Sequence, residues 1–408
     1  MSVPRSRITM LTSLYPAVSH TFITREVLGL RDRGFEVYTC SLNKPRKEEL
    51  LTVQYRDEAS NTFYIKTLNP VAMAMAHLRQ FIRSPFRYLS GFFLAVRSHQ
   101  PGVKGLVWSL FYFAEAGIVA DWTERLDIGQ LYVHFANAAS SVAMIASRMN
   151  HRPFVIRAHG QTDFYDSRGL NLHGKFTSAQ AVICISDFCR GQVFRLLSHE
   201  EWPKVRVVRC GLDPTVFLPQ PRQEMLDSTT RFLCVARLAS EKGLPLLLHA
   251  CRNLLDINMP FKCTVVGDGP DKRTLEALRD RLGLREHVCF VGAVGQDRIQ
   301  DHYDRADVFV LPSFSEGVPV VLMEAMAKEL PVISTTVMAI PELVQDGVDG
   351  LLVRPADAEA LANAMLLLAK NPQLRRRLGK AGRAKVIAEY NLGTNVTKLA
   401  QILQYSQQ

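Results

Sequence analysis

The chain alternates short apolar runs with segments whose apolar residues recur every three to four positions. Apolar, β-branched runs of this length predict strands, and the longer periodic segments predict helices. In the first half, strands are predicted at 7–12, 36–42, 131–135, 154–157, 181–185 and 205–208. In the second half they are predicted at 231–235, 262–266, 288–291, 308–311, 332–334 and 351–353, with helices at 244–255 and 272–282 between them.

This alternation is typical of parallel βαβ units, so the predicted class is α/β with two Rossmann-like, doubly wound parallel sheets. A length of 408 residues also exceeds what one hydrophobic core usually supports. The proline-containing polar segment 213–228 is the predicted linker. We therefore expect a first domain at 1–212, a second at 229–386, and a helix at 387–408 that returns to the first domain. Ligands of such folds bind at the carboxyl ends of the strands, which predicts a cleft between the two domains.

Local signals at helix ends refine this picture. Ser186, followed by Asp187, is a predicted N-cap of a helix ending near residue 197. A long helical tail is predicted from Pro372 to the end of the chain.

Composition supports a globular protein, with 47% hydrophobic and 22% charged residues. The eight cysteines form no Cys-x-x-Cys pair and stand mostly in apolar runs, so buried thiols and a reducing compartment are expected. The N-terminus has too short an apolar run for a signal peptide, and no uncharged apolar stretch reaches the ~18 residues of a membrane span. We expect a cytoplasmic protein.

The net charge of +10 is concentrated in the first half. Residues 1–215 carry 26 Lys and Arg against 17 Asp and Glu, a net +9. No acidic residue occurs between Glu58 and Glu115, where six basic residues interrupt an apolar segment. Residues 66–112 therefore suggest peripheral contact with an anionic membrane or a lipid-phosphate acceptor. An ordinary pair of amphipathic helices with a solvated basic face explains the pattern equally well. No nucleic-acid reader motif accompanies the charge, so no nucleic-acid partner is predicted.

The run from Pro312 to Met326 carries the first chemical signal. It follows a predicted strand, and a proline in it stands where the first turn of a helix would begin. Backbone N–H groups at such a helix start favour anionic or electron-rich oxygen ligands. Two glutamates in the run would present carboxylates to the paired hydroxyls of a sugar. Taken alone, one glutamate would complement the helix dipole and the other would be a solvated helix residue. The run nominates Glu316 and Glu324 together with Gly317, Val318, Pro319 and Val320.

A second signal lies in the loop after the first strand of the second domain. Arg237 and Lys242 are close enough to hold one diphosphate. Negative charge grows on a diphosphate leaving group, and fixed cations stabilise that charge most in the transition state. A surface salt bridge, for instance between Lys242 and Glu241, is the ordinary alternative. No Asp-x-Asp sequence is present to hold a divalent ion. We therefore expect a reaction without metal or cofactor.

With these residues in order, the sequence resembles the retaining glycosyltransferases of family 4, which have the GT-B fold, and in particular bacterial members that build exopolysaccharides. The resemblance implies that Glu316 contacts the transferred sugar and that Glu324 binds the ribose. It implies a diphosphate grip for Arg237 and Lys242, and contact with the base for Val291 and Val294. It also implies an acceptor-binding role for the first domain.

In the first domain the resemblance identifies His159 as a cleft histidine that hydrogen-bonds the donor sugar, with His134 as a second candidate. A lone histidine is more often structural. The sequence departs from the family where a Gly-Gly loop often follows the first strand. Here Ser19, His20 or Thr21 would take over that role.

The resulting prediction is transfer of a sugar from a UDP- or GDP-sugar, with retention of configuration, to a glycan or polyprenyl-diphosphate-linked glycan. The acceptor hydroxyl would attack on the face from which the diphosphate departs. A sugar-nucleotide epimerase on the same fold and a non-catalytic nucleotide-sugar-binding scaffold are the alternatives. The resemblance to exopolysaccharide enzymes adds a location at the inner face of the membrane.

Overall fold

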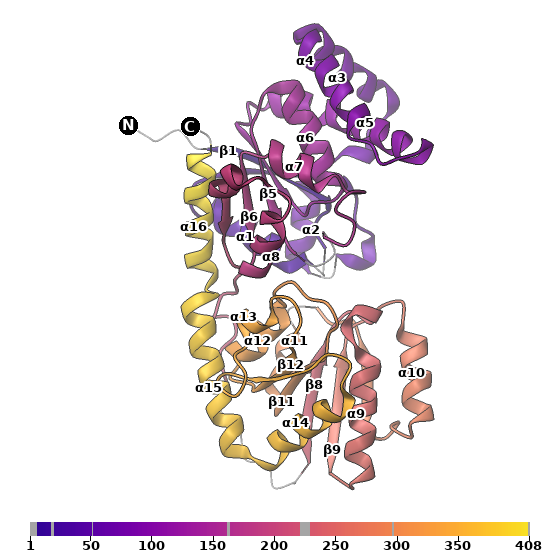
Figure 1. The fold of residues 1–408 in the computed structure, drawn as a ribbon, viewed down its shortest axis with the longest axis vertical. Coiled ribbons are helices and arrows are strands. Elements are labelled where there is room, and N and C mark those ends of the chain that lie inside the picture. Colours follow the sequence, from indigo (N-terminus) through magenta and orange to yellow (C-terminus); the bar gives the residue numbers. More distant parts are fainter. Residues whose placement is uncertain are drawn as a thin grey trace. The chain divides into compact units, whose positions relative to one another are not determined.

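Two parallel sheets organise the protein in a computed structural model that describes residues 6–17, 20–50, 52–160, 164–220, 229–295 and 298–406. Each sheet belongs to its own compact unit (Figure 1). Unit 1 contains the chain up to Arg209 together with the chain from Gly393 onward, and unit 2 spans Cys210–Leu392. This architecture is the predicted α/β class.

Unit 1 contains a seven-stranded sheet in the order β3-β2-β1-β4-β5-β6-β7, and its paired strands run parallel. Its strands are β1 (Arg7–Leu14), β2 (Glu36–Asn43), β3 (Phe63–Tyr64), β4 (Gln130–His134), β5 (Phe154–Ala158), β6 (Ala181–Cys184) and β7 (Val205–Val207). Its helices are α1 (Thr21–Arg31), α2 (Val53–Ser60), α3 (Pro70–Arg83), α4 (Pro85–Arg97), α5 (Val103–Arg125), α6 (Ala138–Asn150), α7 (Leu172–Ser178) and α8 (Asp187–Phe194).

Unit 2 contains a six-stranded sheet in the order β10-β9-β8-β11-β12-β13, and its paired strands are also parallel. Its strands are β8 (Thr230–Val235), β9 (Phe261–Val266), β10 (Val288–Gly292), β11 (Val308–Leu311), β12 (Val332–Thr335) and β13 (Leu351–Val353). Its helices are α9 (Leu244–Asp256), α10 (Lys272–Arg281), α11 (Ile299–Asp304), α12 (Val320–Ala327), α13 (Ile340–Leu343), α14 (Ala358–Lys370) and α15 (Pro372–Glu389).

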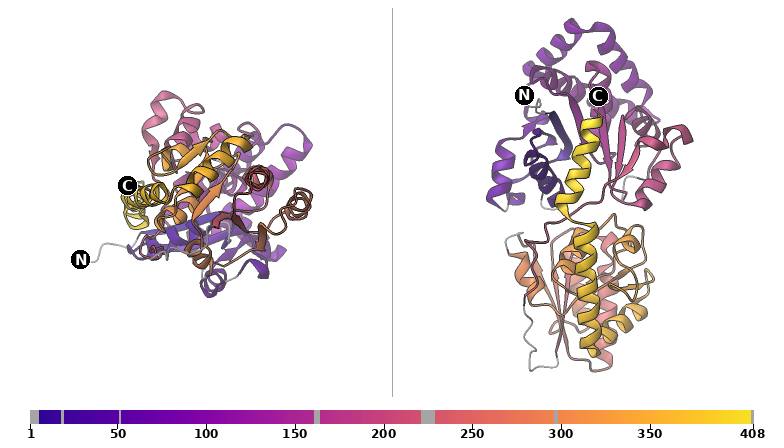
Figure 2. Two further views of the ribbon diagram at one scale, coloured as in Figure 1. Left: turned by 90° about the horizontal axis from the view of Figure 1, so that it is seen from below. Right: turned by 90° about the vertical axis from the view of Figure 1, so that its left-hand side faces the viewer.

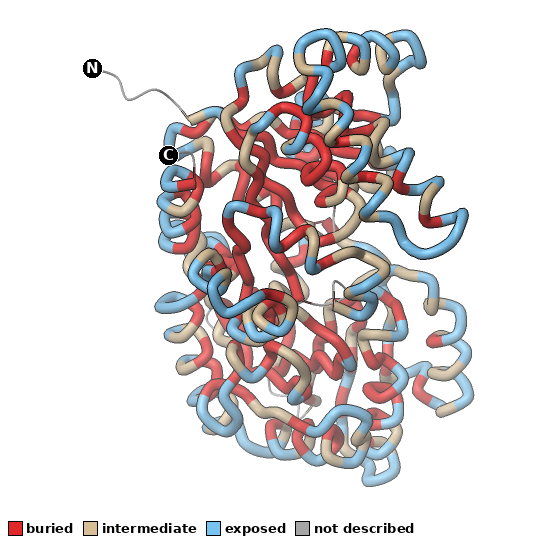
Figure 3. Tube along the Cα trace, turned by 45° about the horizontal axis from the view of Figure 1, so that its top comes forward, coloured by how far each residue is buried: buried red, intermediate tan, exposed pale blue. Residues whose placement is uncertain are grey.

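The buried strands explain why the pattern predicted them. In β4, β5 and β6 every residue is buried, because helices cover both faces of a doubly wound sheet (Figure 3). The twelve predicted strands are confirmed, with ends shifted by up to two residues. The two-residue edge strand β3 was not predicted, because so short a strand leaves no period to detect.

Helix ends agree with the prediction in part. The Ser186 side chain accepts a hydrogen bond from the Cys189 N–H, which confirms the N-cap. Its helix, α8, ends at Phe194 rather than near residue 197. Pro319 precedes the first residue of α12 instead of occupying the first turn.

The predicted single tail helix is two helices, α15 and α16 (Leu392–Tyr405), with a break at Tyr390–Asn391. The break has a hydrogen-bonding cause, because the Tyr390 carbonyl accepts the Leu212 N–H at 3.0 Å and the Leu392 N–H donates to the Leu212 carbonyl at 2.9 Å. Gly211 permits this approach, since a Cβ there would lie 2.7 Å from the Leu392 Cα. Beyond the break, α16 lies against unit 1 (Figure 2). The Arg33 side chain donates to the Gly393 carbonyl at 2.6 Å and to the Thr397 hydroxyl at 3.0 Å. The residue limits predicted for the linker stay a prediction, because residues 221–228 lie outside the described ranges.

Helices α3, α4 and α5 form a layer of their own at the top of Figure 1. Acidic residues from α5 pair with part of the basic segment: Arg79 contacts Asp121 at 2.7 Å, and Arg83 contacts Glu124. Among the described helices, α5 is long and apolar enough to cross a bilayer by length and composition, and 44% of its most apolar window is buried. All eight cysteines are thiols; seven are buried as expected, and Cys289 is exposed.

Candidate functional site

Unit 2 brings the two predicted loops together at the point where its strand order reverses. Strand β8 lies between β9 and β11, so the crossover helices on its two sides cover opposite faces of the sheet. The chain after β8 and the chain after β11 therefore lead to opposite faces of the sheet from neighbouring points on its carboxyl edge, where ligands bind in open α/β sheets. Arg237 and Lys242 follow β8, and Glu316 follows β11.

Backbone contacts fix these two loops against each other. The Phe314 N–H donates to the Glu241 carbonyl at 2.8 Å. Gly243 adopts φ +64°, and a Cβ at this position would lie 2.0 Å from the Pro312 carbonyl oxygen. Only glycine allows this approach, so the geometry of the site depends on that residue.

Glu316 is the buried anchor of the site, with 4% of its surface exposed. Its Oε1 accepts hydrogen bonds from Lys242 Nζ at 2.7 Å and from the Ser313 hydroxyl at 2.7 Å. Lys242 therefore pairs with the predicted sugar-binding carboxylate and not with Glu241. A charge-assisted pair of this length holds both side chains in one geometry.

Glu324 lies in α12 and is 1% exposed, so it is not a solvated helix residue. The Tyr303 hydroxyl donates to its Oε2 at 3.0 Å. The nominated Gly317, Val318 and Pro319 form the segment directly before α12, and Val320 is its first residue. The structure thus places both carboxylates and the helix start on one short segment.

Arg237 differs from Lys242 in that its side chain is exposed and has no polar partner within the described part of the chain. An unpaired cation in the same loop as Lys242 is suited to an anionic ligand. Val291 lies at the end of β10 with 41% of its surface exposed, and Val294 is half-buried in the following loop. Both lie on the carboxyl side of the same sheet. Their contact with a base stays a prediction.

Three predicted histidines of unit 1 gather at the carboxyl ends of β1, β4 and β5. His134 Nδ1 lies 3.1 Å from His159 Nε2. The rings of His20 and His159 both pack on Phe135, with centroid distances of 5.0 and 4.3 Å. Ser19, the other residue nominated here, lies outside the described residues.

A buried charge network supports these histidines. Glu26 Oε1 lies 3.1 Å from His134 Nε2, and Glu26 Oε2 lies 3.1 Å from the Arg157 guanidinium. The Tyr132 hydroxyl donates to Glu26 Oε1 at 2.5 Å. The Glu26 carboxylate near His134 Nε2 favours a proton on that nitrogen. His134 Nδ1 then has no proton and can accept a hydrogen bond from the Nε2–H of His159. Glu26 and His134 thus help to hold the His159 ring in place.

Burial keeps all three imidazoles neutral near pH 7. Burial, reinforced by the neighbouring His134, lowers the pKa of His20 to about 4. Burial and the nearby His134 and Arg157 hold the pKa of His159 well below its ordinary value. For Glu26, burial favours the neutral acid, but Arg157 and His134 outweigh it and lower the pKa of the carboxyl group. The cluster therefore contains three neutral imidazole rings that can form hydrogen bonds, together with the ionised carboxylate of Glu26.

Sequence reasoning missed Glu26, Arg157, Ser313 and Tyr303, which hold the predicted residues in place. Glu26 stands in an otherwise amphipathic helix, where a charged residue normally predicts a solvent-facing position. Within the described residues, no group of three or more His, Cys, Asp or Glu side chains could hold a metal ion.

Comparison with known proteins bears on the family of the chain. Residues 220–385 match the family described as Glycosyl transferases group 1. The chain is similar to the putative colanic acid biosynthesis glycosyltransferase WcaL of Escherichia coli, with 28% identity over 96% of this chain and 97% of that protein. It is also 38% identical to the amylovoran biosynthesis glycosyltransferase AmsK of Erwinia amylovora, over 49% of this chain and 51% of that protein.

Solved structures show the same fold. A sucrose-phosphate synthase from Thermosynechococcus elongatus matches with a TM-score of 0.76 at 19% identity, covering 98% of both chains. Anabaena Alr3699/HepE in complex with UDP and glucose matches with a TM-score of 0.74 at 17% identity, covering 98% of this chain and 100% of that one. The two sheets define a protein of the GT-B fold. The chain carries a glycosyl transferases group 1 domain and is a glycosyltransferase.

Proposed function

We propose that this glycosyltransferase moves a sugar from a UDP- or GDP-sugar, with retention of configuration, to a glycan or lipid-linked glycan in bacterial exopolysaccharide biosynthesis. The observation that carries the proposal is the unit 2 site at the strand reversal. There Lys242 pairs with Glu316 at 2.7 Å, and the exposed Arg237 stands in the same loop as Lys242, after β8. The names of WcaL and AmsK, which refer to colanic acid and amylovoran biosynthesis, support the pathway.

Each residue has a role in this reaction. Arg237 and Lys242 stabilise the negative charge that grows on the leaving diphosphate, which requires no metal or cofactor. Glu316 contacts the transferred sugar, and Glu324 accepts the ribose hydroxyls. In unit 1, His159 hydrogen-bonds the donor sugar. The acceptor oxygen forms the new bond on the face where the diphosphate leaves, and its proton passes to the departing phosphate oxygen.

Thermal-shift screening of UDP-, GDP- and ADP-sugars tests donor binding, because a ligand of the folded state raises the melting temperature. One nucleotide series should raise it, and Glu324→Ala should abolish that rise. No shift with any nucleotide sugar would contradict the proposal.

Product analysis separates transfer from its alternatives. A transferase releases free nucleoside diphosphate and glycosylates an added acceptor. An epimerase yields a new sugar nucleotide without acceptor, and a scaffold binds the donor without turnover; either result would overturn the proposal.

We further propose that the α3–α5 layer docks at the cytoplasmic face of an anionic membrane, so that the protein is cytoplasmic and peripheral. Large apolar side chains are exposed on all three helices, for example Ile82 at 71%, Phe86 at 86% and Val103 at 81%. Arg87, Arg97 and Lys104 lie on the same helices and have no ion partner in the described chain. Apolar side chains beside unpaired cations match the interface of an anionic bilayer.

Flotation with vesicles of phosphatidylglycerol and phosphatidylethanolamine tests this contact. The protein should float at low salt and dissociate at high salt, because ionic strength screens the charges. Phe86→Ser combined with Arg87→Ser should abolish flotation. As a matched control, Val53→Ser, at a residue 65% exposed outside the layer, should leave it unchanged. Equal flotation of all three proteins would contradict membrane docking through this layer.

A further inference from the structure

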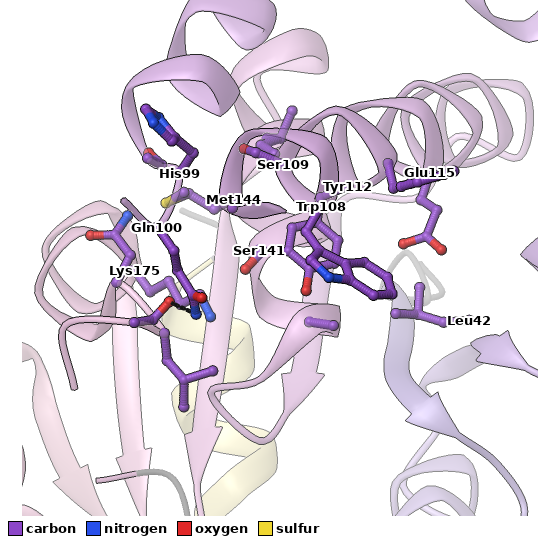
Figure 4. A pocket seen from close by; sticks show the side chains of 18 of the residues that line it. Leu42, His99, Gln100, Trp108, Ser109, Tyr112, Glu115, Ser141, Met144 and Lys175 are labelled. Carbon is purple, nitrogen blue, oxygen red and sulfur yellow. Dashed lines mark hydrogen bonds between the residues drawn. The ribbon is translucent and has the colours of Figure 1, made fainter. Parts of the chain in front are cut away.

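A pocket of about 860 Å³ lies within unit 1, and the three histidines of the cluster are not among its lining residues. It is bounded by the carboxyl ends of β1 and β2, by α5, and by the segments 98–105 and 169–171. Figure 4 shows Trp108, Tyr112 and Glu115 directed from α5 toward the sheet, where Leu42 lies. This volume is typical of small-molecule sites, which range from about 300 to 1,000 Å³.

Glu115 is the feature of this pocket that points to a ligand. The residue is 7% exposed, and its Oε2 has no hydrogen-bond partner among the described residues. Its Oε1 lies 3.7 Å from Lys66 Nζ. Burial raises the pKa of the carboxyl group, and Lys66 lowers it in part. A buried oxygen without a hydrogen-bond partner destabilises the folded state, and a ligand hydroxyl could donate the missing hydrogen bond.

Two aromatic residues, Trp108 and Tyr112, precede Glu115 by about two turns and one turn on the same helix. Trp108 is 49% exposed, and its ring lies 6.3 Å from that of Tyr112 at an interplanar angle of 28°. A half-exposed aromatic face offers a large apolar surface at little conformational cost. An aromatic face beside a carboxylate that accepts hydroxyl groups is suited to a sugar ring.

One lysine and two exposed apolar side chains lie on α5 close in sequence to Trp108. Lys104, one turn before Trp108, lines the pocket and has no polar partner in the described chain. Val107 and Phe111 on the same helix are 45% and 57% exposed. An ammonium group favours a phosphate, and exposed apolar side chains favour a hydrocarbon chain.

We propose that this pocket binds a glycosyl unit linked through diphosphate to a lipid, with the sugar on Trp108 and Glu115 and the diphosphate at Lys104. This inference rests on the proposed function, because it locates the acceptor of the transfer reaction. It predicts that Trp108, Glu115 and Lys104 recognise the acceptor.

Calorimetric titration of the full chain tests the site without requiring turnover. The probes are farnesyl diphosphates carrying glucose, galactose, mannose or N-acetylglucosamine, together with farnesyl diphosphate and the methyl glycosides of the same sugars. At least one glycosylated probe should bind ten-fold or more tightly than farnesyl diphosphate. Trp108→Ala and the isosteric Glu115→Gln should each weaken that binding by roughly ten-fold. Lys104→Ala should weaken the diphosphate probes alone.

Matched controls separate pocket binding from surface adsorption. Phe93→Ala removes an aromatic ring that is 61% exposed outside the pocket, and Asp127→Asn neutralises an exposed acid of the same unit. Both should bind as the wild type does. Binding that Trp108→Ala and Glu115→Gln leave unchanged, or an absence of binding by every glycosylated probe, would overturn the proposal. Equal affinity for a methyl glycoside and its lipid diphosphate would overturn the diphosphate part.

The test also distinguishes this inference from the proposed function. Arg237→Ala should retain probe binding, because Arg237 lies in unit 2. If the probes bind but no nucleotide sugar shifts the melting temperature, the donor assignment is wrong and the pocket stands. If nucleotide sugars bind and the probes do not, the pocket assignment is wrong.

Discussion

Single charged residues in unit 2 divide into those that hold the site and those available to a ligand. Glu316 and Lys242 are buried or nearly buried and bonded to each other at 2.7 Å. Arg237 is exposed and has no polar partner in the described chain. Removing a paired residue therefore changes both structure and chemistry, whereas removing Arg237 changes mainly the chemistry.

Arg237→Ala should lower kcat/KM by about 10²–10³-fold, because it removes a fixed charge that stabilises the leaving diphosphate. The melting temperature without ligand should stay within about 1 °C of the wild type, since the exposed side chain has no polar partner in the described chain. Steady-state kinetics and differential scanning fluorimetry measure the two effects. Lys272→Ala removes another partly exposed cation of unit 2, which lies 3.7 Å from Asp268, and should leave kcat/KM unchanged. Equal losses in both variants would contradict a specific role for Arg237.

The histidine cluster of unit 1 predicts a loss of stability in acid. His20 has its pKa lowered to about 4 by burial and by His134, from an ordinary value of 6.5. Between these values the unfolded chain binds a proton that the folded chain does not, so the free energy of unfolding falls as pH falls. The pKa values of His134 and His159 are lowered as well, so both histidines act in the same direction.

Lowering the pH from 7 to 5 should therefore reduce the free energy of unfolding of unit 1 by about 1 kcal/mol or more. Urea denaturation across this range measures it. His20→Asn should show a smaller pH slope than the wild type. His151→Asn, at a residue in a surface turn, should keep the full slope. A pH-independent free energy of unfolding would contradict neutral, buried histidines.

At the scale of elements, the site of unit 2 depends on how closely two loops approach. Gly243 connects the turn Ser240–Lys242 to α9, at a position where a Cβ would lie 2.0 Å from the Pro312 carbonyl oxygen. The chain cannot move this atom without moving the loop that carries Glu316.

Gly243→Ala should lower the free energy of unfolding by about 2 kcal/mol or more, because a positive φ and a backbone clash both disfavour alanine. Donor affinity should also fall, since the Lys242–Glu316 geometry is disturbed. Gly191→Ala in α8 is the matched control, because nothing lies within 4 Å of the added Cβ. Helix propensity predicts a neutral or slightly stabilising effect there. If Gly243→Ala keeps the stability and the donor affinity of the wild type, the prediction is contradicted. The loops after β8 and β11 could then move apart without loss of free energy.

At the scale of the whole molecule, the chain begins in unit 1, forms unit 2 and returns to unit 1 through α16. Val396, Leu399 and Leu403 of this helix are at most 2% exposed. Val396 packs on Gly29, where an added Cβ would lie 3.2 Å from its methyl carbons. A unit built from two distant parts of the chain loses stability when either part is removed.

Ending the chain after Leu392 should destabilise unit 1 by several kcal/mol, because each buried aliphatic side chain contributes about 1.5–3 kcal/mol. Scanning calorimetry should show a lower transition for unit 1, while the transition of unit 2 keeps its response to nucleotide sugar. Tyr405→Ala, at a residue 79% exposed on the same helix, should change neither transition. An unchanged unit 1 transition in the shortened chain would show that α16 contributes no stability.

The sequence predicted most strands and nominated the site residues of unit 2 from local properties. A buried strand requires a short apolar run, and the Glu316–Glu324 segment places two carboxylates at a helix start. By contrast, the tail helix is interrupted where the Tyr390 carbonyl and the Leu392 N–H both hydrogen-bond to Leu212, 178 and 180 positions earlier, which no local pattern encodes. Asp121 and Glu124 partly neutralise a basic segment that contains no acidic residue of its own.

By itself, the sequence determined the α/β class and the strand positions, and it nominated the residues proposed to bind a diphosphate and a sugar. These follow from periodicity and from the chemistry of neighbouring side chains. The tertiary structure alone decided that Lys242 pairs with Glu316, that Glu26 lies beneath His134, and that Glu115 lines a pocket with an unsatisfied oxygen. Each of these facts joins residues far apart in the chain, and such pairs are brought together by strand order and helix packing, which one-dimensional patterns do not contain.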